Sequence, residues 1–264
     1  MRQRVLTLTI YGLSGLIGLA AFAYPFFLPI TPVAAISSEV TPPNTPLLTM
    51  VLIVLCLVVL LIEVQGQTVS AKVVAALGLL VAATSILRFV ETAVPGPAGF
   101  SPVFVPILLA GYVFGARFGF LMGTLTLLTS ALVTGGVGPW LPYQMFAAGW
   151  VGLTAGWLPH PQRPAAVLTL LLLFGFVWGM AYGLVLNLYF WPFIIGDPAM
   201  SWAAATGWRE SLSSYAAFYL ATSLYWDLTR AAGNVLLLLV VALPTIRALA
   251  RFRDRFRFDV QGVH

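Results

Sequence analysis

The stretch from Ser101 to Gly196 carries only two charged side chains, Arg117 and Arg163. Of all 264 residues 8% are charged and 60% are hydrophobic, whereas a water-soluble domain has about 25% charged residues. Apolar runs of about 18 residues or more predict transmembrane helices, because a helix satisfies its own backbone groups in lipid. The sequence therefore predicts an all-α, polytopic helical membrane protein.

We expect eight membrane-spanning helices, at residues 5–30, 47–64, 70–89, 102–116, 117–134, 140–158, 165–190 and 215–249. The last is longer than a bilayer requires, so its first turns should project outward or break near Trp226 and Asp227. The first begins like a signal peptide, but its apolar run is too long for one, and we expect a retained helix. Residues 1–68 form two leading helices with their connector, and residues 69–264 form a six-helix domain with a basic tail.

The basic residues favour an orientation with both termini in the cytoplasm. In that orientation three of them, Arg88, Arg209 and Arg230, fall on the outer side, and the other ten fall on the inner side. Cytoplasmic segments carry an excess of Lys and Arg, so the distribution predicts a multi-pass protein of the cell membrane. The net charge of +5 is then a topology signal, and we expect the lipid bilayer, and no nucleic acid, as a partner.

Motifs for catalysis and metal binding are missing from the sequence. It contains no G-x-x-x-x-G-K-[ST], H-E-x-x-H or G-x-S-x-G motif, and its single cysteine, Cys56, lies in an apolar run. A carboxylate pair for acid–base catalysis cannot be assembled in the nearly uncharged middle of the chain. We therefore expect no enzyme, no cofactor and no metal site. The alternatives are a membrane-embedded lipid-modifying enzyme and a membrane scaffold that transports nothing.

Polar and aromatic residues gather at the outer ends of the predicted helices. The glycine- and proline-rich segment TGGVGPWLPYQMF, residues 134–146, interrupts the apolar runs, and unwound backbone at membrane depth is tolerated where it lines a cavity. Asp227 and Arg230 are three apart on one helix and can pair. A charge at membrane depth costs about 2.5–3.5 kcal/mol and usually faces a cavity or a partner.

These features predict a binding pocket for a small, planar, partly polar molecule. The alternative is that the same residues only anchor the helices at the level of the lipid headgroups. The candidate substrate-binding residues are Arg88, Glu91, Thr134, Gly135, Gly136, Trp140, Tyr143, Gln144, Asn187, Trp191, Trp226, Asp227, Arg230 and Asn234.

Small residues recur at four-residue spacing, which lets two helix backbones approach closely. Two glycine series, Gly111, Gly115, Gly119, Gly123 and Gly175, Gly179, Gly183, favour packing between helices of the same chain. A third set, which we call the alanine strip, begins at the inner end of its helix, and for it partner docking is as plausible as internal packing. The alanine strip consists of Ala71, Ala75, Gly78 and Ala82.

Three blocks of the chain suggest a family: SAKVVAALGLLVAATSILR, the block from FVPILLAGYVFG to AAGWVGLTAG, and DLTRAAGNVLLLLVVALPTIRALARF. The most specific part is a glycine-rich turn followed by Pro-Trp-x-Pro-x-Gln-Met. From about residue 70 to residue 257 the chain resembles the substrate-binding S component of energy-coupling factor (ECF) vitamin transporters. The two leading helices depart from the plain six-helix pattern of that family.

The resemblance implies a subunit that captures a vitamin on its outer face. It delivers the vitamin inward when docked to a transmembrane coupling subunit and two ATP-binding-cassette ATPases. The resemblance places substrate loops at residues 89–101, 134–142 and 191–214, and partner contacts at Ala71 and Ala75. The Gly-Pro-Trp stretch resembles the branch linked to cobalamin or other corrinoids, although an aromatic outer face would also suit a flavin or a pterin.

Overall fold

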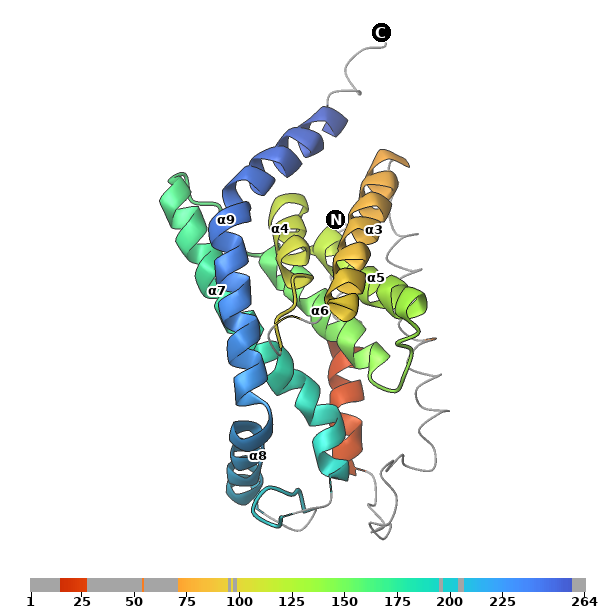
Figure 1. The fold of residues 1–264 in the computed structure, drawn as a ribbon, viewed down its shortest axis with the longest axis vertical. Coiled ribbons are helices and arrows are strands. Elements are labelled where there is room, and N and C mark those ends of the chain that lie inside the picture. Colours follow the sequence, from red (N-terminus) through yellow and green to blue (C-terminus); the bar gives the residue numbers. More distant parts are fainter. Residues whose placement is uncertain are drawn as a thin grey trace, which may run out of the picture.

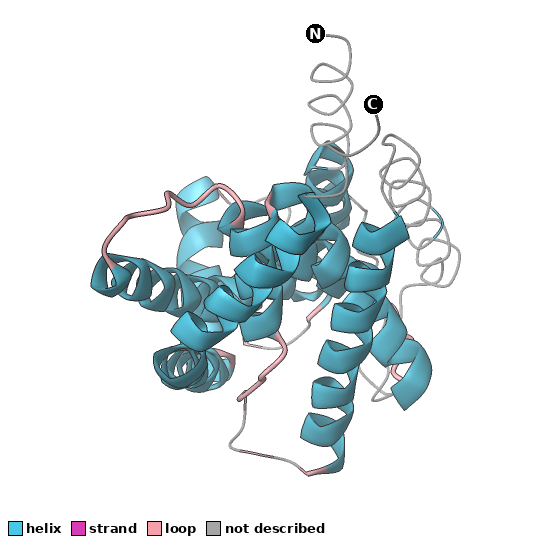
Figure 2. Cartoon of the chain, turned by 90° about the horizontal axis from the view of Figure 1, so that it is seen from above, coloured by secondary structure: helices cyan, strands magenta, loops and turns pink. Residues whose placement is uncertain are grey.

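The computed structural model describes residues 15–27, 54, 71–94, 96, 99–194, 197–203 and 207–257. All regular structure in these residues is helical (Figure 2), and four of the described helices are long and apolar enough to cross a membrane. The predicted all-α membrane fold is therefore confirmed. Apart from Val54, the predicted helix at 47–64 lies outside the described residues.

The four long helices are α3 (Ala71–Ala93), α5 (Ala116–Thr134), α7 (Pro164–Phe190) and α9 (Leu224–Arg257). Two shorter helices, α4 (Phe104–Phe114) and α6 (Leu141–Ala155), are enclosed by the long ones, and most of their residues are buried. In Figure 1 they lie between α7 and α9 on one side and α3 on the other. The core of the domain is therefore built around α4 and α6.

The predicted spans at 102–116 and 140–158 are shorter in the structure than expected. The helix α4 ends at Gly115, whose φ of 95° is a conformation that glycine adopts readily. The helix α6 ends at Gly156, where a Cβ would lie 2.1 Å from the backbone nitrogen of Ala116. The first end is set by the backbone conformation of Gly115 and the second by a close backbone contact, and the apolar sequence on either side does not reveal them.

The predicted last span, 215–249, is interrupted, as expected, but the break lies slightly before the predicted position near Trp226 and Asp227. The structure has α8 (Trp208–Thr222), a break at Ser223, and then α9, so the chain breaks before Trp226 and Asp227. The hydroxyl of Ser223 accepts a hydrogen bond of 2.7 Å from Nδ2 of Asn187 on α7. The break therefore places the Ser223 hydroxyl within hydrogen-bond distance of α7.

Both glycine series pack inside the domain, as the sequence favours, except for Gly115, where a Cβ would meet nothing within 4 Å. A Cβ on Gly119 would lie 2.2 Å from the carbonyl oxygen of Gly152 on α6, and one on Gly179 would lie 2.4 Å from Cα of Ala231 on α9. The first series joins α4 and α5 to α6, and the second joins α7 to α9. Side chains larger than hydrogen have no room at these crossings.

The two ends of the domain differ in composition. One end, which we call the basic end, carries the start of α3, the α4–α5 turn, the α6–α7 loop and the C-terminal half of α9. Its basic residues include Lys72, Arg117, Arg163, Arg247 and Arg253. The opposite end, which we call the α8 end, holds α8 and η2 (Trp191–Phe193) and is seen at the bottom of Figure 1.

We predict that Gly152→Ala destabilises the protein by about 1–3 kcal/mol, the usual cost of an extra methyl group in a well-packed core. The new Cβ would lie 2.0 Å from the carbonyl oxygen of Gly119. Unfolding in detergent measures the change. Gly78→Ala is the matched control, because a Cβ there meets nothing within 4 Å. Equal stability of the two variants would contradict the close α5–α6 crossing.

Candidate functional site

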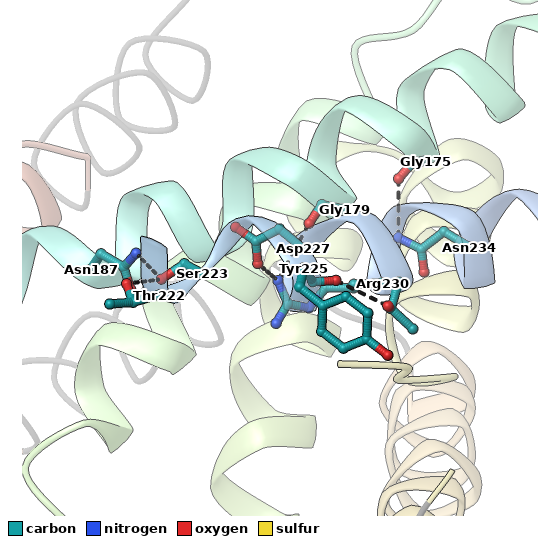
Figure 3. A network of polar contacts seen from close by, with 10 residues as sticks. Gly175, Gly179, Asn187, Thr222, Ser223, Tyr225, Asp227, Arg230 and Asn234 are labelled. Carbon is teal, nitrogen blue, oxygen red and sulfur yellow. Dashed lines mark hydrogen bonds and ion pairs between the residues drawn. The ribbon is translucent and has the colours of Figure 1, made fainter. Parts of the chain in front are cut away.

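A series of polar contacts connects the first half of α9 to α7 (Figure 3). Arg230 pairs with Asp227 one turn away, and its Nη1 donates a hydrogen bond of 3.3 Å to the carbonyl oxygen of Gly179. One turn further on, Nδ2 of Asn234 donates a hydrogen bond of 3.0 Å to the carbonyl oxygen of Gly175. The glycines leave these carbonyl groups open to side chains from the neighbouring helix.

Gly183 makes room for the carboxylate of Asp227. A Cβ at Gly183 would lie 2.0 Å from Oδ1 and 2.2 Å from Oδ2 of that carboxylate. Asp227 is only 1% exposed, so its charge depends on Arg230 for compensation. The third glycine of the series is therefore what allows the ion pair of α9 to pack against α7.

The second carboxylate oxygen of Asp227, Oδ2, is buried and has no hydrogen-bond partner among the described residues. Tyr219 lies beside this carboxylate. It belongs to α8, which is not one of the four helices long and apolar enough to cross a membrane. Burial raises the pKa of the Tyr219 hydroxyl to about 12, and the neighbouring carboxylate adds to the increase. The hydroxyl therefore stays protonated, and it is a donor from this chain beside the Asp227 carboxylate.

A cavity of about 400 Å³ opens beside this ion pair. It lies at the α8 end, between the start of α6, the last two turns of α7, and the start of α9. Four of its lining side chains are aromatic, and the others combine amides, a hydroxyl and the ion pair. The lining residues are Trp140, Gln144, Gly183, Leu186, Asn187, Tyr189, Phe190, Ser223, Trp226, Asp227 and Arg230.

The structure brings six of the predicted site residues together in this lining: Trp140, Gln144, Asn187, Trp226, Asp227 and Arg230. They come from α7, from α9 and from the turn that leads into α6, so residues far apart in sequence meet at one cavity. Tyr143 is buried directly behind them. Its ring stacks on that of Tyr189 with the centroids 4.4 Å apart.

The other predicted site residues lie outside this lining, and most have contacts elsewhere. Glu91 accepts a hydrogen bond of 2.8 Å from Oγ of Ser101, and Arg88 is half-buried one turn earlier on α3. Trp191 is buried and donates from Nε1 to the carbonyl oxygen of Met200. Asn234 is buried on the carbonyl of Gly175.

The glycine-rich turn after α5 shapes the entry to α6 without lining the cavity itself. Thr134 donates its hydroxyl to the carbonyl oxygen of Ser130, which closes the last turn of α5. Gly135 follows in the left-handed conformation, with a φ of 69°. The carbonyl of Gly136 accepts a hydrogen bond of 3.3 Å from Nε1 of Trp140, which orients this ring at the cavity.

Sequence reasoning missed five lining residues: Gly183, Leu186, Tyr189, Phe190 and Ser223. Three of them could have been found from Asn187, because residues 183, 186, 187 and 190 have the i, i+3, i+4, i+7 spacing of one helix face. Tyr189 lies at the edge of that face. Ser223 has no such signal, since it lies in the break between two helices.

The fold and the cavity define a class: a multi-pass helical membrane protein with a ligand-sized, aromatic and polar site at one end. The family model described as ECF transporter, substrate-specific component matches residues 72–242, and the chain belongs to this family. Members of the family are transporter subunits rather than enzymes. Comparisons with curated proteins and with solved structures gave no match.

We predict that Asp227→Asn lowers the free energy of unfolding by about 1–3 kcal/mol, because it leaves the partly buried guanidinium of Arg230 without its ion-pair partner. The double variant Asp227→Asn, Arg230→Gln should lose less than the sum of the two single variants. Unfolding in detergent measures both.

Asp254→Asn is the matched control, because Asp254 belongs to an exposed pair with Arg253 at the basic end. An exposed pair contributes little to stability, so this variant should unfold like the wild type. If Asp227→Asn also unfolded like the wild type, the ion pair would not support the α7–α9 contact.

Proposed function

We propose that this chain is the membrane-embedded substrate-binding subunit of an ECF-type ABC importer that captures a vitamin or a related micronutrient. The observation that supports the proposal best is the cavity at the α8 end, where four aromatic side chains surround a buried ion pair. Such a site combines flat apolar faces with a few fixed polar groups, as small-molecule sites do. Of the substrate-binding residues predicted from the sequence, the six that line the cavity contact the substrate in this proposal.

The α8 end faces outward and the basic end faces the cytoplasm, with both termini inside. The concentration of Lys and Arg at the basic end supports this orientation in the cell membrane. The vitamin enters from outside and leaves inward when the subunit is docked to a transmembrane coupling subunit and two ABC ATPases. The lipid bilayer surrounds the long helices.

We rank a corrinoid first among the candidate vitamins, because the Gly-Pro-Trp stretch at residues 138–140 resembles the branch of the family linked to corrinoids. The aromatic lining and the volume of about 400 Å³ would also suit a smaller ring system, a flavin or a pterin. The Asp227 carboxylate, as part of the cavity lining, offers an acceptor to a ligand N–H or O–H group. The ligand meets this acceptor with its polar edge and the aromatic side chains with its ring faces.

The alanine strip is the partner-docking surface in this proposal. Ala75, Gly78 and Ala82 are exposed on α3, and a Cβ on Gly78 would meet no atom within 4 Å. The strip is thus smooth and unoccupied by other described helices, unlike the two glycine series. Ala71, the first residue of α3, continues it at the basic end.

Purification of the full chain in detergent, followed by mass spectrometry of co-purifying small molecules, tests the proposal. A panel of cyanocobalamin, riboflavin and folic acid, titrated against tryptophan fluorescence, identifies the ring system. The proposal requires that the chain alone binds a vitamin and that transport needs the ATPase partners. Turnover of a lipid without partners would favour the enzyme alternative, and no ligand at all would favour the scaffold.

Trp140→Ala should weaken vitamin binding by about 1–3 kcal/mol if its ring stacks on the ligand, by analogy with the stacking of bases on aromatic side chains. Trp140 lines the cavity and is 43% exposed. The control is Trp157→Ala, since Trp157 is exposed at the basic end and should not affect binding. Equal affinities, measured by titration, would assign Trp140 to the membrane interface only.

Ala75→Trp should abolish vitamin uptake in cells that carry the coupling subunit and ATPases, while the affinity of the purified chain stays at the wild-type value. A large side chain at this position holds a neighbouring helix away from the smooth strip. Ala83→Trp is the control, because Ala83 is exposed on α3 outside the strip. Loss of affinity in Ala75→Trp would instead connect the strip to the cavity.

A further inference from the structure

The first described segment of the chain lies outside residues 72–242, the part that the family model matches. Residues 15–23 are helical and lead into η1 (Tyr24–Phe27). This leading segment, red in Figure 1, lies beside the end of α7. Its contacts connect it to both sides of the candidate binding site.

The helical part of the leading segment is packed tightly against α6. A Cβ on Gly18 would lie 2.5 Å from Cζ2 of Trp150, and Phe22 is only 5% exposed. The ring of Phe22 meets that of Tyr143 edge-on, with the centroids 5.1 Å apart, and lies 5.7 Å from that of Trp150. In contrast, Leu19 on the same helix is 60% exposed.

The contact between Phe22 and Tyr143 continues to the cavity. The ring of Tyr143 stacks on Tyr189 with an interplanar angle of 15°, and Tyr189 lines the cavity. Tyr143 itself is only 4% exposed, so it cannot shift without moving its two aromatic neighbours. The position of the Tyr189 wall therefore depends on Phe22.

A second contact joins η1 to the segment between α7 and α8. The ring of Phe26 lies 5.7 Å from that of Trp202 and 6.1 Å from that of Trp191. Trp191 packs in turn against Tyr215 of α8, with the centroids 4.9 Å apart. Phe26 thereby contacts a cluster that holds α8 against the end of α7, and Ser223, directly after α8, lines the cavity.

We infer that the leading segment is a brace of the binding site, in which Phe22 positions the Tyr143–Tyr189 wall and Phe26 positions Trp191, Trp202 and α8. The inference rests on the proposed function for the role of the cavity, although the contacts themselves stand without it. The leading segment then contributes to the structure of the substrate-binding domain, and its removal would change the cavity. Phe22 and Phe26 are positioning residues, since neither lines the cavity.

Hydrogen–deuterium exchange of the full chain in detergent tests the brace without any ligand. Phe26→Ala should speed exchange in residues 191–203 and 208–222, because the cluster around Trp191 loses its partner from η1. Leu19→Ala, on the exposed side of the same helix, should exchange like the wild type there. Unchanged exchange in Phe26→Ala would overturn the inference for the α8 side.

Vitamin affinity tests the other side, with cyanocobalamin, riboflavin and folic acid as the probes. Phe22→Leu keeps an apolar side chain in the core and should weaken the binding of the probe that the wild type binds by about 2- to 10-fold, the equivalent of one aromatic pair. Leu19→Ala should bind with wild-type affinity. Full wild-type affinity in Phe22→Leu would overturn the inference for the Tyr189 wall.

A double-mutant cycle separates positioning from general destabilisation. If Phe22 acts through Tyr143 and Tyr189, Phe22→Leu should cause little further loss of affinity in a Tyr189→Leu background. Additive losses would contradict this route. If no probe binds the wild type, the proposed function fails for these vitamins, while the exchange experiment still decides whether the brace exists.

Discussion

The buried ion pair of Asp227 and Arg230 is the interaction on which the rest of the binding site depends. A carboxylate at 1% exposure is tolerated only with a cation beside it, and Arg230 supplies that cation from the next turn of α9. The pair fits between α7 and α9 because residue 183 is a glycine, whose missing Cβ leaves space for the carboxylate. The close crossing of these two helices and the polar floor of the cavity are therefore one feature.

The walls around this floor come from three separate parts of the chain. Trp140 is oriented by the carbonyl of Gly136 in the turn before α6, and Tyr189 is stacked on Tyr143 within the core. The third wall is formed where the chain breaks between α8 and α9. There the hydroxyl of Ser223 accepts a hydrogen bond from Asn187. Each wall is held by contacts within the protein, so the cavity is formed before a ligand arrives, which lowers the entropic cost of binding.

The family membership and the geometry answer different questions. The match to residues 72–242 shows that the chain is a substrate-specific component of an ECF transporter, whereas the nature of its ligand is a matter for the cavity. The leading segment, which lies outside the match, packs against Tyr143 and Trp191.

The sequence predicted the helices best where their ends are marked by local residues. The ends of α5 and α7 were expected at residues 134 and 190, where the structure has them, and the two glycine series were expected to pack inside the domain. The bounds of α4, α6 and α8 were missed. The end of α6 depends on the backbone contact of Gly156 with Ala116, which joins residues forty positions apart and has no local signature.

By itself the sequence determined that this protein is a helical membrane protein. Its long apolar runs carry very few charges, and in a lipid bilayer such runs must form helices to satisfy their backbone hydrogen bonds. It also determined that Asp227 and Arg230 pair, because their spacing on one helix is local information. Only the tertiary structure decided that Gly183, Tyr189 and Ser223 line the cavity and that Asn234 does not. These assignments depend on which faces of α7, α8 and α9 meet, and helix crossings are set by packing between residues that are distant in the chain.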